Sequence, residues 1–187
     1  MKPQIALLAL CSCLALATPA AGVGIAALDL DPTIAGVQDT LDVTVGKAFQ
    51  LDLVLSGFTP GQIQSYQAAV AFDPLSVLGV SASGGDVLPP PVFLLDLDVQ
   101  ADQILIAELG LGGPGTGNGV LASFQLVATA EGASDISISQ VLLSGAFGDP
   151  IAVGSLRGGS ITAAIPEPGS ALLFAVGATV VGRLRRR

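Results

Sequence analysis

The stretch Phe49-Gln50-Leu51-Asp52-Leu53-Val54-Leu55-Ser56 decides the fold, because large apolar residues return at every second position along it. In an extended chain, successive side chains point to opposite faces, so this period of two puts the apolar residues on one face of a strand. The pattern continues on both sides of the stretch, in residues 41–45 and in residues 66–72. Each run therefore predicts a β-strand with one face in a hydrophobic core and the other toward solvent.

Turn signals separate these runs and continue along the chain. They are rich in glycine and proline, which supply the backbone conformations that turns require: Thr59-Pro60-Gly61, Asp73-Pro74, 83–86, Pro89 to Pro91 and 110–119. Further strands are predicted at 92–97, 103–109, 120–128, 135–143, 151–153 and 160–164, and no sustained apolar repeat at helical spacing occurs between residues 22 and 165. About nine short strands in one domain predict an all-β sandwich with Greek-key or jelly-roll connections.

The segment before these strands, residues 22–37, has no clear period. It is interpreted as an N-terminal arm or a first edge strand. The predicted domain therefore begins at residue 38 and ends at residue 164.

Several turn and core positions of this domain resemble a cohesin domain. The first third of that pattern is matched by residues 43–55 and then Phe72-Asp73-Pro74-Leu75 with Leu78 and Val80. In that pattern a leucine after the Phe-Asp-Pro turn packs back into the core. The second half is matched by residues 117–121, 124–126, 136–143 and 158–161. The resemblance implies a nine-stranded jelly-roll sandwich related to a class of carbohydrate-binding modules. It also implies a non-catalytic module that binds a dockerin partner, although the matching residues are structural and transfer the fold better than the ligand.

The first 21 residues have the features of a secretory signal peptide. Lys2 supplies a positive charge, residues 5–17 are apolar, and Thr18-Pro19-Ala20 is a small-residue cleavage site. Cleavage is expected after Ala20, with Gly22 as an alternative, and lipidation at Cys13 is a second alternative. Both cysteines of the chain, Cys11 and Cys13, lie in this segment, so the exported chain has no thiol and no disulfide.

Residues 165–187 have three parts: Pro166-Glu167-Pro168, an uncharged apolar run at 169–182, and the basic group Arg183, Arg185, Arg186 and Arg187. As a helix the run spans about 21 Å, which is short for a membrane crossing. This order of parts at a C-terminus resembles the PEP-CTERM sorting signal of Gram-negative bacteria that make exopolysaccharide. The resemblance implies transient insertion into the inner membrane, recognition and cleavage by an exosortase-type enzyme, and delivery to the cell surface or extracellular matrix. The alternative is a buried C-terminal core helix with a solvated basic end.

Charge is distributed very unevenly along the chain. Between residues 22 and 165 there are two basic and fourteen acidic residues, a net charge of −12. Such a surface repels nucleic acid and anionic lipid and keeps an exported protein soluble.

The residue types needed for most catalytic sites are missing. The sequence contains no histidine and no Gly-x-Ser-x-Gly nucleophile elbow, so an enzyme is not expected. No cofactor is assigned; calcium is possible at Asp29 with Asp31, or at Asp96 with Asp98, if Asp42 or Glu108 lies nearby. The favoured interpretation of these aspartates is a solvated strand face.

Binding of sugar by stacking needs exposed aromatic side chains, and the chain has no tryptophan and one tyrosine. The alternation places Tyr66 in the core, whereas Phe58 and Phe93 flank turns and are expected to be exposed. The predicted function is an exported, non-enzymatic module that binds another extracellular protein, with exopolysaccharide binding or a passive structural role in the matrix as alternatives. An apolar, aromatic-poor sheet face would favour the first function, and exposed aromatics on one face would favour the second.

Overall fold

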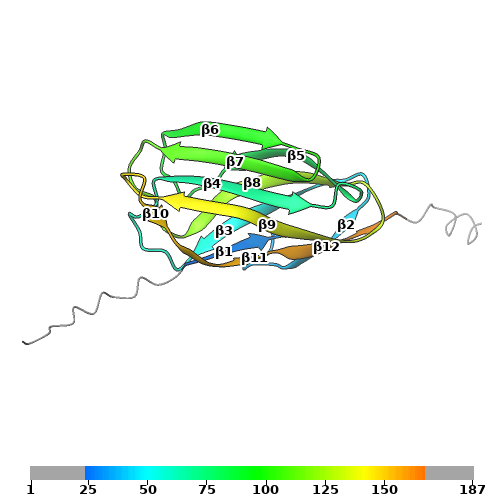
Figure 1. Cartoon of the computed structure of the whole chain (residues 1–187). Helices are drawn as coiled ribbons and strands as arrows, with labels where there is room; N and C mark the ends of the chain where they lie inside the picture. The colour runs from blue at the N-terminus through cyan, green and yellow to red at the C-terminus, as the bar shows by residue number, and fades with distance from the viewer. Residues whose placement is uncertain (1–23, 167–187) are drawn as a thin grey trace, which may run out of the picture.

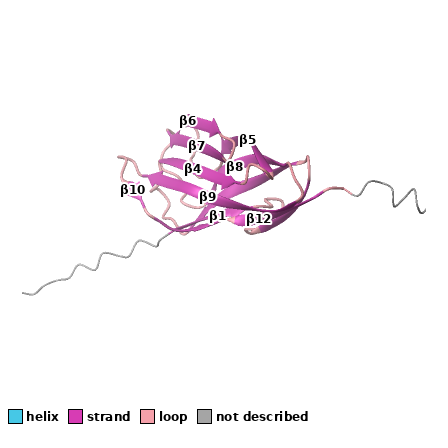
Figure 2. Ribbon diagram, turned by 45° about the vertical axis from the view of Figure 1, so that its right-hand side comes forward, coloured by secondary structure: helices cyan, strands magenta, loops and turns pink. Residues whose placement is uncertain are grey.

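The computed structural model describes residues 24–166, which form two β-sheets packed face to face, with no helix in this range (Figures 1 and 2). The twelve strands are β1 (Gly24–Asp29), β2 (Thr40–Thr44), β3 (Ala48–Ser56), β4 (Ser65–Phe72), β5 (Val77–Gly84), β6 (Val92–Val99), β7 (Gln103–Gly110), β8 (Gly119–Ala128), β9 (Gly132–Ser144), β10 (Pro150–Ile151), β11 (Val153–Arg157) and β12 (Gly159–Ala164). One sheet has the order β11-β1-β3-β8-β5 and the other the order β2-β12-β9-β4-β7-β6, with β10 paired to β9. The predicted all-β sandwich is confirmed, with twelve strands in place of about nine.

The alternating stretch at residues 49–56 lies at the centre of the five-stranded sheet, because β3 pairs with β1 on one side and β8 on the other. Leu51, Leu53 and Leu55 are at most 1% exposed and face the opposite sheet. The core is one continuous cluster between the two sheets, as the period of two predicts.

The segment 22–37 was interpreted as an N-terminal arm or a first edge strand, and its described part, residues 24–37, fits neither interpretation. Within that segment β1 lies inside the sheet, antiparallel to β3 and parallel to β11. Five of its six residues are buried on one face or the other, including Ala26 in the core and Ala27 on the outer face. A strand covered on both faces has no alternation of polar and apolar residues, so the periodicity of the sequence did not indicate β1. The described sandwich therefore begins well before residue 38.

A second strand without a clear pattern is β5, which follows the predicted turn at Asp73. The carbonyl of Asp73 accepts hydrogen bonds from the backbone N–H groups of Ser76 (3.1 Å) and Val77 (2.9 Å). After this turn Val77 enters the core fully buried, whereas Leu75 and Leu78 are 82% and 51% exposed. The core residue after the Phe-Asp-Pro turn is therefore a valine, and not one of the leucines that the cohesin resemblance suggested.

Candidate functional site

The outer face of the seven-stranded sheet carries an apolar surface that no other layer of the described chain covers. Its strands β9, β4, β7 and β6 place side chains in three lines across the sheet: Ser144, Ser65, Leu109 and Phe93; Leu142, Gln67, Ala107 and Asp96; and Gln140, Ala69, Leu105 and Asp98. Residues directly opposite each other in antiparallel strands point to the same face. Because Tyr66, Ala68 and Val70 point into the core, these three lines point outward. We call this surface the apolar face.

The centre of the apolar face is uncharged. Phe93 and Leu142 are 58% and 53% exposed, and Leu105 and Leu109 on β7 are half-buried. The polar groups present are neutral, and Gln67 donates a hydrogen bond to Gln140 at 3.4 Å. Charge enters only at the margin of these lines, where β6 contributes two aspartates.

The outer face of the five-stranded sheet has a different character. There Gln125 donates to the Gln50 side-chain oxygen (3.1 Å), and Gln50 in turn donates to Asp52 (2.9 Å). These groups form a polar ladder across β8 and β3. The outer face of the five-stranded sheet therefore differs by this polar ladder, although Leu78 (51% exposed) and the half-buried Val127 also lie on it. On the seven-stranded sheet, an apolar centre with a charged margin is the arrangement typical of a protein-binding surface.

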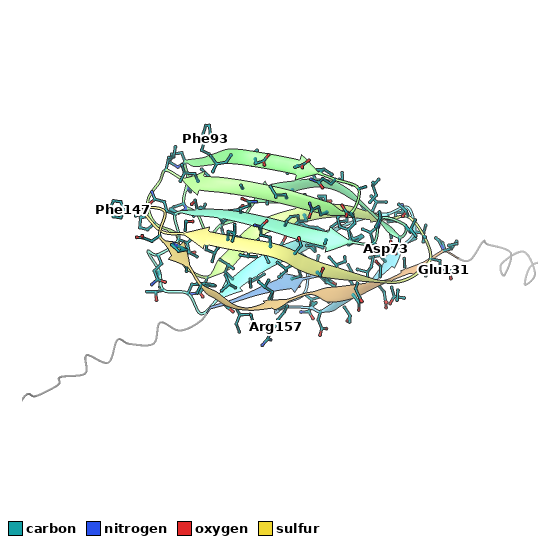
Figure 3. The ribbon with its side chains drawn as sticks, viewed as in Figure 1. Asp73, Phe93, Glu131, Phe147 and Arg157 are labelled. Carbon is teal, nitrogen blue, oxygen red and sulfur yellow. The ribbon has the colours of Figure 1, made fainter. Side chains whose placement is uncertain are left out.

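The exposure of three aromatic side chains was predicted from the sequence and can be compared with the structure. Tyr66 is 3% exposed in the core, as predicted. Phe93 is exposed, also as predicted, and Phe147 in the turn between β9 and β10 is 93% exposed; Figure 3 shows both at the same end of the sandwich. The prediction for Phe58 is wrong, because its ring is 5% exposed and packs against Gly24, where any Cβ would overlap it.

A buried polar pair lies in the core beneath the apolar face. Tyr66 and Glu108 are directly opposite in β4 and β7, and the phenol donates a hydrogen bond to Oε2 of Glu108 at 2.9 Å. Gly84 on the facing sheet leaves room for the carboxylate, since a Cβ there would overlap its oxygens. Burial, and then the nearby Glu108 carboxylate, raise the pKa of the Tyr66 phenol far above its usual value. The pair is a structural contact in the core and not an exposed acid–base site.

This raised pKa predicts a specific loss of stability at high pH. The folded chain holds the Tyr66 proton above about pH 10, where the unfolded chain releases it, so the free energy of unfolding falls by about 1.4 kcal/mol per pH unit from there upward. Tyr66 is the sole tyrosine and tryptophan is absent, so tyrosinate absorbance follows this one group. We expect it to rise only as the protein unfolds in base.

The matched variant is Tyr66→Phe, which removes this slope above about pH 10. At neutral pH the same change leaves the buried Glu108 carboxylate without its donor and costs about 1–3 kcal/mol in urea unfolding. A tyrosinate titration with a midpoint near 10 in the folded chain would contradict the buried pair.

The candidate calcium ligands do not come together. Among residues 24–166, no three His, Cys, Asp or Glu side chains lie close enough to hold a metal ion. Asp29 is not on a solvated face as expected: it is 7% exposed, and its Oδ1 accepts from the backbone N–H groups of Gln38 (3.0 Å) and Asp31 (3.3 Å). Asp29 therefore closes the loop between β1 and β2. Asp96 and Asp98 are solvent-exposed, as expected.

The predicted sorting and processing residues lie almost entirely beyond the described chain. Pro166 is its last residue and is exposed. Ala20, Glu167, Pro168, Arg183, Arg185, Arg186 and Arg187 lie outside the described residues. No helix within residues 24–166 has the length and apolar character needed to cross a membrane.

Comparison with solved structures identifies the fold of this sandwich. The chain is similar to the cohesin module of a family 33 glycoside hydrolase from Clostridium perfringens (14% identity, 78% of this chain and 99% of that chain, TM-score 0.61). It is also similar to the sixth cohesin of scaffoldin B from Acetivibrio cellulolyticus, solved in complex with a Cel5 dockerin (16% identity, 75% and 99% covered, TM-score 0.59). A non-cellulosomal cohesin from the archaeon Archaeoglobus fulgidus matches comparably (12% identity, 77% and 93% covered, TM-score 0.58).

The described domain thus has the cohesin fold, which confirms the fold that the sequence resemblance implied. No protein-family model matches the chain, and no curated protein sequence matches it.

Proposed function

We propose that this chain is an exported, non-enzymatic binding module that holds another extracellular protein on its apolar face. The observation that carries the proposal is the uncharged centre around Leu105, Leu109 and Leu142, which no described layer covers. Surfaces of this kind bind proteins because a dry apolar centre supplies affinity and a charged margin supplies specificity. The likeness to cohesins solved with dockerins supports a protein as the ligand.

The charge of the domain further limits which proteins can bind to it. Asp96 and Asp98 border the apolar face, and the domain as a whole carries far more acidic than basic residues. A partner with an apolar centre and a basic rim fits this surface, and its association is accelerated at low salt. Acid–base catalysis has little support, since the sequence lacks histidine and the buried Glu108 is occupied by Tyr66.

A second candidate is binding of exopolysaccharide, favoured by the exposed rings of Phe93 and Phe147. The two rings come from different strands and turns, and only Phe93 belongs to the three lines of the apolar face. Sugar binding by stacking needs rings that form a platform, and aromatic residues are otherwise missing from those lines. Protein binding is therefore the better-supported function.

Export and sorting complete the proposal. The signal peptide at residues 1–21, cut after Ala20, directs export, and the tail at 165–187 is a PEP-CTERM-like signal for an exosortase-type enzyme. The tail is inserted transiently into the inner membrane and the domain then reaches the cell surface or matrix. The support is the order of the three parts in the sequence, together with the exposed end of the described chain at Ile165 and Pro166.

The binding proposal is tested by capture from the host's extracellular fraction, with the full chain as bait and with polysaccharide present or digested. A discrete protein captured in both conditions supports the proposal. Capture that requires polysaccharide supports the carbohydrate alternative, and capture of nothing by a folded bait supports a passive structural role.

The sorting proposal predicts a defect when the basic end of the tail is neutralised. Replacing Arg183, Arg185, Arg186 and Arg187 by glutamine removes the charges that hold this end on the cytoplasmic side. We expect a longer, uncleaved form that accumulates in the membrane, measured by intact mass and cell fractionation. An unchanged mass and location would contradict the sorting role, and Lys47→Gln serves as a control for a lost positive charge elsewhere.

A further inference from the structure

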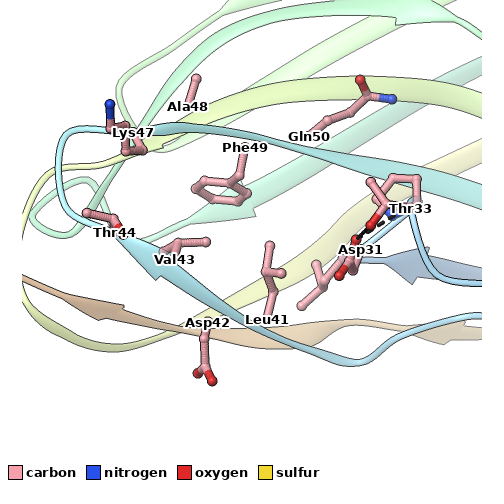
Figure 4. Close-up of a pocket in the computed structure, with 12 residues that line it drawn as sticks. Asp31, Thr33, Leu41, Asp42, Val43, Thr44, Lys47, Ala48, Phe49 and Gln50 are labelled. Carbon is pink, nitrogen blue, oxygen red and sulfur yellow. Dashed lines mark hydrogen bonds between the residues drawn. The ribbon is translucent and has the colours of Figure 1, made fainter. Parts of the chain in front are cut away.

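A groove opens on one long side of the sandwich, where β2 and β3 leave each other to join different sheets. Its volume is about 510 Å³. Figure 4 shows the ring of Phe49 extending from β3 toward Leu41 and Val43 of β2, while Asp42 points away. We call this space the β2–β3 groove.

The floor of the β2–β3 groove is apolar and only partly covered. Leu41, Val43 and Phe49 pack against the core but remain partly exposed, and Leu30 beneath them is fully buried. Polar groups lie at the two ends: Lys47 at the turn between β2 and β3, and Asp31 at the other end (Figure 4). An apolar segment that entered the groove would cover core side chains that water now reaches, which is favourable at about 25 cal/mol per Å² of apolar surface.

The described chain ends beside this groove. The last strand, β12, runs parallel to β2, and Ala164 is the partner of Thr44, which lines the groove. The carbonyl of Ala164 accepts a hydrogen bond from the N–H of Val45 at 3.0 Å. The described chain therefore ends close to the Lys47 end of the groove.

We infer that the apolar run of the chain's own tail, around Leu172, Leu173 and Phe174, binds in the β2–β3 groove in chains whose tail is not inserted in a membrane. Leu172 is eight positions beyond Ala164, which allows a reach of about 26 Å along an extended chain and exceeds the length of the five-residue strand β2. To return along β2 the chain has to reverse its direction, and Pro166-Glu167-Pro168 stands at that point, where proline suits a turn.

The charges of the groove and the tail are complementary. A tail that enters at the Lys47 end and runs toward Asp31 brings its basic end, Arg183 to Arg187, to the acidic end of the groove and away from the lysine. The contact is also intramolecular, so its effective concentration is high and a modest affinity suffices. Binding of this kind hides the apolar run from water while the chain is soluble, and it does not depend on the partner of the apolar face or on cleavage of the tail.

The first test uses the absence of tryptophan from the sequence. In the full chain, Phe49→Trp places a single fluorophore on the groove floor. We expect its emission at shorter wavelength, and better protected from acrylamide, than in the same chain with Leu172→Ser, Leu173→Ser and Phe174→Ser. Leu78→Trp, on the outer face of the five-stranded sheet and away from the groove, is the control and should not respond to the tail substitutions.

Equal emission from Phe49→Trp in the two tails would overturn the inference, provided that both chains unfold at the same urea midpoint. A difference that disappears on dilution would also overturn it, because it would show that the groove binds the tail of a second copy.

The second test does not depend on changing the groove. A photo-crosslinking residue replaces Phe174 in the full chain, and a mixture of heavy- and light-isotope chains is irradiated. We expect crosslinks within one chain to the segment that contains Leu41 and Val43 or to Phe49. Crosslinks elsewhere on the domain, crosslinks between heavy and light chains, or no crosslink at all would each overturn the inference.

Discussion

Replacing Leu105 and Leu109 together by glutamate should weaken binding of the captured partner by about 30-fold or more. Both side chains are half-buried on β7 within the apolar face, Leu109 beside Phe93 and Leu105 beside Asp98. Truncation of a side chain at the centre of a protein interface costs about 2 kcal/mol or more, which corresponds to about 30-fold in the dissociation constant. A buried, unpaired carboxylate in the interface costs further free energy. The measurement is the dissociation constant by titration calorimetry.

The matched control is Leu78→Glu with Val127→Glu. These two residues are directly opposite in β5 and β8 and point outward from the other sheet, so the pair makes the same change in charge. We expect the control to bind within about threefold of the unchanged chain, since added negative charge far from an interface acts mainly on the association rate. Equal loss in both variants would indicate repulsion by net charge alone, and unchanged affinity of the Leu105 and Leu109 variant would place the binding surface elsewhere.

The sequence signal was clearest for strands that have one buried and one solvent-exposed face. In β3 and β4 the apolar residues return with a period of two, and the structure buries the residues that this period selects, from Leu51 to Leu55 and from Tyr66 to Phe72. The period depends only on local geometry, so no knowledge of neighbouring strands was needed.

The strands that were missed carry no such contrast. β1 is covered on both faces, so alanines and Asp29 are buried where the rule expects exposed residues. In β5 one of the core positions is Gly79. A Cβ there would lie 2.8–2.9 Å from Ile104 and Phe72 of the opposite sheet, so the position has no room for a larger side chain. A glycine that is required by contact with a distant strand resembles a turn residue when only its neighbours in the sequence are considered.

The apolar face was not located from the sequence for a related reason. β7 carries Ile104 and Ile106 on its inner side and Leu105 and Leu109 on its outer side. Such a run is typical of a strand buried on both faces, and only the topology shows that no described layer covers the outer one. In residues 103–109, apolar side chains occur at both odd and even positions, so both faces of the strand are apolar. This was the sequence feature that could have indicated an apolar outer face. The Glu108 contact with Tyr66 likewise depends on strand register, which the sequence did not establish.

The largest loss of stability is expected for Phe124→Ala. Phe124 is fully buried in β8, which lies between β3 and β5, and it is the largest of the completely buried side chains. Removing such a ring costs its transfer free energy plus that of the cavity, about 3–5 kcal/mol. Both cysteines lie in the segment 1–21, so residues 24–166 rely on this core without a disulfide. Urea unfolding measures the loss as a lower midpoint at an unchanged m-value.

The control is Val127→Ala, three residues along the same strand but on the outer face, where the side chain is half-buried. Its cost should be about 1 kcal/mol or less. A domain of this size has a free energy of unfolding of about 5–15 kcal/mol. Loss of the Phe124 ring therefore removes a large fraction of that free energy and leaves the chain close to unfolding. A cost for Phe124→Ala no greater than that for Val127→Ala would mean that the two sheets do not pack on each other through β8, which would remove the rigid support on which the apolar face depends.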